Sequence, residues 1–197
     1  KITYALMRKS NHHLGRRFEA LERRAMLSSV PFGASAEDTA EFLLGDVAVN
    51  VVLMESNGAI DASTEDWTPE LKEQVKATVE EGALWWTETL ADFSDVHQLN
   101  FTFDYQYVDS PVATSYEPIS RRSQDASLWV EEFFRAVDVP SSPGFTTEIR
   151  EFNHRQRLAH NANWSFTIFV VNADNDPNDR FGNENATNTE FSRAFAY

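Results

Sequence analysis

The sequence predicts an α/β fold, built on a mixed, mostly parallel twisted sheet of about four strands and three helices. Two segments, 47–54 and 164–172, carry apolar and β-branched residues on both sides of the pleat, as strands buried on both faces do. An amphipathic segment between 68 and 90 separates the first of them from an alternating segment at 99–107. Strand, helix and strand in this order form a βαβ unit, whose two strands are parallel. An α+β arrangement is the alternative.

The longest predicted helix begins at Thr68, which is followed by Pro69 and Glu70. These are an N-cap residue, a proline at the first helical position and an acid in the first turn. Apolar residues then recur at helical spacing: Leu71, Val75, Val79, Gly82, Trp86 and Leu90. Such a stripe predicts a helix of about six turns that packs on the sheet. The adjacent Trp85 and Trp86 are expected to take part in this packing.

The second half of the chain continues the alternation of strands and helices. The strand at 99–107 should have one apolar and one polar face. A long polar surface connection over 109–122 follows it, with docking of residues 116–119 on the body as an alternative for that part. The later predicted elements are a helix from Asp125 that ends before Pro140, a helix over 146–159 with Ile149, Phe152 and Leu158 partly inward, the central strand 164–172, and an edge strand at 191–197.

Charge divides the chain into two parts. Residues 1–30 hold seven Lys and Arg against two Asp and Glu, whereas residues 31–197 hold ten against twenty-nine. We therefore assign residues 1–45 to a basic, largely disordered N-terminal export or targeting-like segment and linker. Residues 46–197 are assigned to a single α/β domain, truncated at its C-terminus. Met7, which is followed by basic residues, is a candidate for the natural start.

Composition excludes several classes of function. The acidic body repels a phosphate backbone, so no nucleic-acid partner is expected. No apolar run reaches the roughly 18 residues that span a bilayer, so no transmembrane segment is predicted. The absence of cysteine excludes disulfides, thiolate catalysis and cysteine-based zinc sites.

No catalytic residues are assigned from the sequence. It contains no His-Glu-x-x-His, no Gly-x-Ser-x-Gly and no glycine-rich phosphate loop. His154 and His160 are six positions apart, which on a helix points the two rings in different directions. We interpret them as exposed helix residues.

One loop after the central strand is a candidate calcium site. Its candidate ligands are Asp174, Asp176, Asn178 and Asp179, whose spacing resembles the start of a calcium loop. Asp179 stands where such a loop needs glycine for its turn. Asx-turn chemistry is the alternative explanation for this run of residues.

The N-terminal segment resembles a known export-associated motif. Residues 18–28, read F-E-A-L-E-R-R-A-M-L-S, are similar to the Leu-Glu-Pro-Arg-x-Leu-Leu motif of large planctomycete proteins, many of them exported or surface-located. Arg23 stands where that motif usually has proline, and Met26 where it has leucine. The resemblance implies an exported protein, located outside the cell, on its surface or in the periplasm. A basic disordered tail is the alternative.

The domain resembles the N-terminal half of bacterial zincin-type metallopeptidase domains. The matching stretches are V-A-V-N-V-V-L-M-E-S-N-G at 47–58, T-E-D-W-T-P at 64–69 with the helix ending G-A-L-W-W at 82–86, and N-W-S-F-T-I-F-V-V-N at 163–172. The resemblance covers 46–197 and extends to the upper subdomain of a zincin. In that family an edge strand, matched here by 195–197, precedes the helix that carries His-Glu-x-x-His.

The zincin resemblance implies that this chain is the N-terminal, non-catalytic part of an exported zinc-dependent metallopeptidase-like protein. Zinc, and a peptide or protein substrate, are implied for the parent protein only, and the chain as given is predicted to be inactive. The alternative is a complete non-enzymatic exported surface or interaction module. A cytoplasmic α/β enzyme is disfavoured because no cofactor loop is visible.

Overall fold

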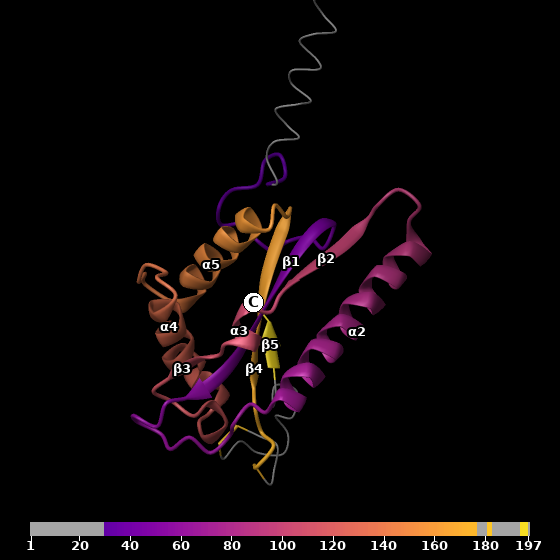
Figure 1. The fold of residues 1–197 in the computed structure, drawn as a ribbon. Coiled ribbons are helices and arrows are strands. Elements are labelled where there is room, and N and C mark those ends of the chain that lie inside the picture. The colour runs from indigo at the N-terminus through magenta and orange to yellow at the C-terminus, as the bar shows by residue number, and fades with distance from the viewer. Residues whose placement is uncertain (1–29, 177–180, 183–193, 197) are drawn as a thin grey trace, which may run out of the picture.

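A computed structural model of the chain describes residues 30–176, 181–182 and 194–196. In this part a sheet lies between α2 on one side and α4 with α5 on the other (Figure 1). In chain order the elements are β1 (Gly45–Ser56), α2 (Pro69–Phe93), β2 (Leu99–Asp104), α3 (Gln106–Asp109), β3 (Val112–Thr114), η1 (Pro118–Ser120), η2 (Ser123–Asp125), α4 (Ala126–Ala136), α5 (Phe145–Ala159), β4 (Trp164–Val171) and β5 (Ala194–Ala196). The α/β prediction is confirmed.

The sheet is mostly parallel, as predicted. Its strand order is β2-β1-β4-β5, and β3 pairs with the carboxyl end of β1 beyond the end of β2. β1 runs parallel to β2, β3 and β4, with Val47 opposite both Phe101 and Trp164. Only β5 is antiparallel, and it pairs with β4. The predicted edge strand is therefore present at 194–196, while the rest of 191–197 lies outside the described residues.

β1, more than β4, is the strand buried on both faces. Every residue from Val47 to Met54 is buried, because α2 lies on one side of β1 and the α4–α5 layer on the other. On β4 the residues facing α4 and α5 are buried, whereas Phe166, Ile168 and Val170 on the α2 side are half-buried. The prediction of a central strand at 164–172 that is buried on both faces is thus correct for one face and wrong for the other.

α2 begins as its capping residues predict but packs less deeply than its stripe suggests. Thr68 caps the helix, since its Oγ1 accepts the Leu71 N–H at 3.3 Å. No side chain of α2 is fully buried. Trp85 and Trp86 are 57% and 49% exposed, which contradicts the expectation of core packing. The C-terminal half of α2 faces β2, the edge strand, across a groove instead of packing closely on it, so the two rings stay in water.

The opposite side of the sheet holds the largest apolar cluster, in which aromatic rings meet edge to face. The ring centroid of Phe133 lies 5.6 Å from that of Phe152 and 5.8 Å from that of Phe169. Leu158, expected partly inward, is instead 52% exposed. Its neighbour Arg157 takes the inward position, and adjacent residues on a helix point about 100° apart.

The chain departs from the predicted elements after β2. The strand stops at Asp104, because its Oδ1 accepts the Gln106 N–H at 2.9 Å and turns the chain into α3. The predicted surface connection at 109–122 includes β3 and the turn η1, whose Pro118 and Ile119 are buried. This connection therefore contributes to the core instead of lying only on the surface.

Residues 30–44 form no helix or strand, but they are attached to the domain. Arg157, which is completely buried, donates hydrogen bonds of 2.6 Å to the backbone oxygens of Ser35 and Asp38. The Ser165 N–H of β4 donates to the backbone oxygen of Thr39 at 2.8 Å. This part of the predicted linker is thus packed on α5 and β4.

Candidate functional site

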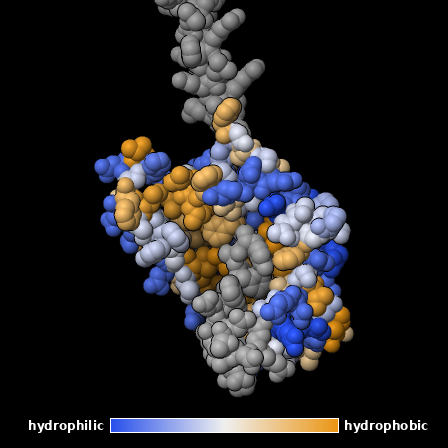
Figure 2. Space-filling view, turned by 180° about the vertical axis from the view of Figure 1, so that it is seen from behind, coloured by the Kyte–Doolittle hydropathy of each residue, from blue (hydrophilic) through white to orange (hydrophobic). Residues whose placement is uncertain are grey.

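The candidate site is a groove between α2 and β4, which we call the α2–β4 groove. Its volume is about 350 Å³, and its walls include Leu71, Val75 and Val79 of α2 and Ile168 and Val170 of β4. Figure 2 shows hydrophobic side chains gathered in a hollow on this face of the molecule. The groove exists because α2 covers β1 and leaves the neighbouring face of β4 half-buried.

One end of the groove is polar and lies at the carboxyl end of β4. Asn172 and Asp174 line it there, and the Asn172 side chain donates to the backbone oxygen of Asp66 at 3.1 Å. Trp67 closes the same end, with its Nε1 donating to the backbone oxygen of Met54 at 2.8 Å. The carboxyl ends of parallel strands are where α/β folds place their ligands.

The residues of the groove favour binding over catalysis. Asp174 is the only titratable group among its lining residues, which include no histidine, serine, lysine or arginine. A nucleophile with an adjacent base, the arrangement that covalent catalysis needs, is therefore missing from this part of the described chain. The groove can accept an apolar surface along its length and a polar group at its Asp174 end.

A zinc ion does not fit the residues that the structure describes. Within residues 30–176, 181–182 and 194–196, no three or more His, Cys, Asp or Glu side chains gather as metal ligands would. His154 Nδ1 accepts the Arg157 Nε–H at 3.0 Å, and His160 Nε2 lies 3.0 Å from Asp104. The two histidines serve separate contacts. Both are partly buried, and His160 lies just after the end of α5, so the prediction of exposed helix residues is wrong. No reaction step is assigned to zinc in this chain.

The predicted calcium loop lies partly within the described residues. The Asp174 N–H donates to Asn172 Oδ1 at 3.0 Å, and the Asp176 N–H donates to the Ala173 oxygen at 3.1 Å. The first of these is an Asx turn, the alternative explanation of the loop. Asn178 and Asp179 lie outside the described residues, so calcium binding remains a prediction.

A second polar feature lies beside the groove, at the carboxyl end of β1, and we call it the carboxylate corner. It consists of Glu55, Asp61, Glu65, Asp66 and Glu117. The backbone N–H groups of Thr64 and Glu65 donate to Glu117 Oε2 at 3.0 and 3.4 Å. Glu65 Oε2 in turn accepts the Asn175 N–H at 2.9 Å. The corner joins the loop after β1 to η1 and to the loop after β4.

Burial and charge shift the pKa values of three carboxyl groups in this corner. Glu117 is 2% exposed, and burial raises its pKa to about 7 although two N–H groups stabilise its charged form. Burial, and then the nearby Asp66 carboxylate, raise the pKa of Glu55. Hydrogen bonds from Arg121 hold the pKa of Asp61 below its usual range.

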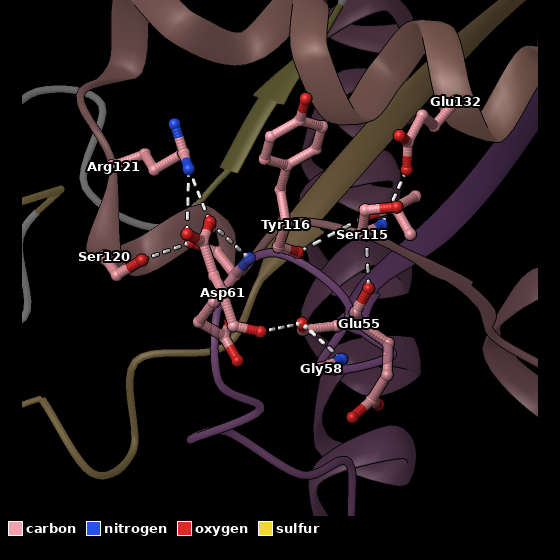
Figure 3. A network of polar contacts seen from close by, with 11 residues as sticks. Glu55, Gly58, Asp61, Ser115, Tyr116, Ser120, Arg121 and Glu132 are labelled. Atoms are coloured by element: carbon pink, nitrogen blue, oxygen red, sulfur yellow. Dashed lines mark hydrogen bonds and ion pairs between the residues drawn. The ribbon is translucent and has the colours of Figure 1, made fainter.

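Figure 3 shows Asp61, in the loop after β1, next to Arg121, and Ser115 next to Glu132 of α4. Ser56 Oγ donates to the backbone oxygen of Asp61 at 3.0 Å and accepts the Gly58 N–H at 3.1 Å. The Ser115 N–H donates to Glu132 of α4 at 2.6 Å. The carboxylates of Asp61, Glu117 and Glu132 accept hydrogen bonds from backbone N–H groups or from the Arg121 guanidinium. These contacts hold the loops together, so the role of the corner is structural.

Asp61 and Arg121 lie in segments predicted as a turn and a surface connection and are not among the predicted site residues. The expectation that residues 116–119 dock on the body is confirmed, since Glu117, Pro118 and Ile119 are buried. The available signal was local: Glu117 stands directly before the apolar pair Pro118-Ile119 in an otherwise polar stretch. Such a pair indicates docking on the core.

Comparison of the chain with models of known families, with curated proteins and with solved structures gives no match. No helix among the described residues is long and apolar enough to cross a membrane.

Proposed function

We propose that this domain is the N-terminal, non-catalytic part of an exported zinc-dependent metallopeptidase-like protein. In this proposal the helix that carries His-Glu-x-x-His packs in the α2–β4 groove. The main support for this proposal is that α2 buries only part of one face of the sheet. Val49, Val51 and Leu53 of β1 are fully buried under α2, whereas Ile168 and Val170 of β4 are half-buried on the same face.

Helix and strand spacings support a second helix at this place. Neighbouring strands lie about 4.8 Å apart and packed helices about 10 Å apart, so one helix covers roughly two strands. α2 covers the β1 and β2 side of the sheet, and a helix beside it would cover β4 and β5. It would bury Phe166, Ile168 and Val170, each of which contributes about 1 kcal/mol when the rest of its apolar surface leaves water.

The chemistry of the groove agrees with a supporting role. Its walls are largely apolar, and the incoming helix would supply two histidine ligands and the catalytic glutamate, with the third zinc ligand coming from elsewhere in the parent protein. In such enzymes zinc activates a water molecule for attack on the peptide bond. The residues of this chain would bury the helix and orient it. The zincin resemblance further implies that β5 borders the cleft for a peptide substrate.

The first experiment is to read the coding sequence beyond Tyr197. A His-Glu-x-x-His motif within a few tens of residues, in a segment with helical periodicity, is the expected result. A stop codon directly after Tyr197 would contradict the proposal and favour a complete non-enzymatic surface or interaction module.

The second experiment tests the packing itself. In the extended protein, Ile168→Asp should lower the Tm and release zinc, because it places a charge under the metal helix. The same substitution in the present 197-residue chain should change the Tm much less, since Ile168 is half-buried there. An equal fall in Tm in the two proteins would contradict the proposed packing of the helix in the α2–β4 groove. Chelator-sensitive peptide hydrolysis by the present chain would contradict its non-catalytic role.

A further inference from the structure

The outer edge of β2 is a free strand edge. β2 ends the sheet next to β1, and among the described residues no backbone group hydrogen-bonds to its outer side. An uncovered edge presents unpaired N–H and C=O groups, which can pair with an added strand. β2 therefore offers half of a binding site for an extended segment.

A groove between β2 and α2 offers a place for the side chains of such a segment. Its volume is about 310 Å³, and it is lined by Glu80, Leu84 and Thr87 of α2 and by Phe101 and Phe103 of β2, among others. The two phenylalanine rings lie on the same face of β2, with centroids 6.4 Å apart, and both are half-buried. Leu84 is 57% exposed. A strand added to β2 would turn every second side chain into this groove.

The charge beside this groove is mostly negative. The nearest basic residue of α2, Lys76, is paired with Glu73 and Asp109. Glu80 accepts a hydrogen bond from the Tyr105 hydroxyl at 3.0 Å. After Val79, α2 carries Glu80, Glu81, Glu88 and Asp92 and no basic residue. Glu80, Leu84 and Glu88 recur every four residues, so they share one face of the helix. Of these acids only Asp92 lies in the last turn of α2, where it meets the negative end of the helix dipole. A cationic partner would offset the mutual repulsion of the four acids.

We infer that the β2 edge and this groove bind an extended basic segment of another polypeptide as an added strand. The backbone of the segment pairs with β2, its apolar side chains contact Phe101, Phe103 and Leu84, and its Lys or Arg side chains lie near Glu80 and Glu88. A second copy of this chain fits less well, because two α2 helices would bring like charges together. β2 is the opposite edge of the sheet from β5, so this inference does not depend on the zinc proposal.

The test measures binding of a fluorescein-labelled peptide, Lys-Val-Lys-Val-Lys-Val-Lys, by fluorescence anisotropy at low salt. Glu88→Lys should raise the Kd about fivefold or more, whereas Glu70→Lys should change it less than about twofold. Both substitutions alter the charge of an exposed α2 residue by the same amount, but Glu70 lies at the far end of the helix. Leu84→Ser should also weaken binding, because it removes an apolar contact.

Backbone pairing has its own readout. Two sets of peptides are N-methylated at alternate positions. In one set the methyl groups replace the N–H groups that face β2, and only this set should bind more weakly, by about tenfold or more. Equal binding of both sets, or equal weakening by Glu70→Lys and Glu88→Lys, would overturn the inference. So would a dimer in sedimentation experiments that Leu84→Ser dissociates, since the edge would then be covered by a second copy.

Discussion

Asp61 and Arg121, sixty residues apart in the sequence, form a two-pronged ion pair. Arg121 Nη2 donates to Asp61 Oδ1 at 2.8 Å, and Nε donates to Oδ2 at 2.5 Å. The guanidinium also lies 4.7 Å from the ring centroid of Tyr116. The pair connects the loop after β1 to the segment after η1.

A double-mutant cycle of Asp61→Ala and Arg121→Ala should give a coupling energy of about 1–2 kcal/mol in urea unfolding. The side chains of this pair are only 19% and 28% exposed, so water screens them weakly. The exposed pair Glu151 and Arg155, each 42% exposed, is the control and should couple by less than about 0.5 kcal/mol. Equal coupling in the two cycles would contradict the structural role of Asp61 and Arg121.

Glu117 should make stability fall as pH rises. Its pKa is raised from 4.5 to about 7 in the folded protein, so between these values the folded state binds more protons than the unfolded state. The free energy of unfolding should therefore fall by up to about 3 kcal/mol from pH 4.5 to above pH 7. Glu55, whose pKa is also raised, acts in the same direction.

The control for this pH dependence is Glu117→Gln, which retains an oxygen to accept the two N–H groups. Its free energy of unfolding should change much less across the same range in urea titrations. The lowered pKa of Asp61 acts elsewhere, because its contribution is lost only as pH falls below about 4. An unchanged slope in Glu117→Gln would show that another group titrates.

Arg157→Met should release the segment before β1. It leaves the backbone oxygens of Ser35 and Asp38 without their charged donor, at a cost of about 2–4 kcal/mol. Cleavage after Glu37 and Glu41 by a glutamate-specific protease should become faster. Arg155→Met, on the exposed face of the same helix, is the matched control and should cleave like the parent protein.

Calcium at millimolar concentration should raise the Tm if the loop of Asp174 and Asp176 binds it, because a ligand that binds only the folded state stabilises it. The double substitution Asp174→Ala and Asp176→Ala should then abolish the shift. A Tm unaffected by calcium would leave the Asx turn between Asn172 and Asp174 as the explanation of these residues.

Trp85→Ala and Trp86→Ala should each lower the free energy of unfolding by only about 1–2 kcal/mol, since about half of each side chain is already in water. Phe133→Ala should cost about 3–5 kcal/mol, because its ring is completely buried among other aromatic rings. Chemical denaturation measures both. A large loss for Trp86→Ala would restore the prediction of core packing.

Local signals in the sequence determined the first strand and the longest helix of this protein. The Thr68-Pro69 cap, the helical spacing of Val75 and Val79 and the continuous apolar run of β1 depend on nearest neighbours along the chain, so their helix and strands are readable from the sequence. Tertiary structure alone decided that α2 covers β1 and leaves Ile168 and Val170 of β4 only half-buried. It also brought Asp61 to Arg121 and buried Glu117. These outcomes depend on which strands become neighbours, and contacts between residues distant in sequence leave no periodic signal.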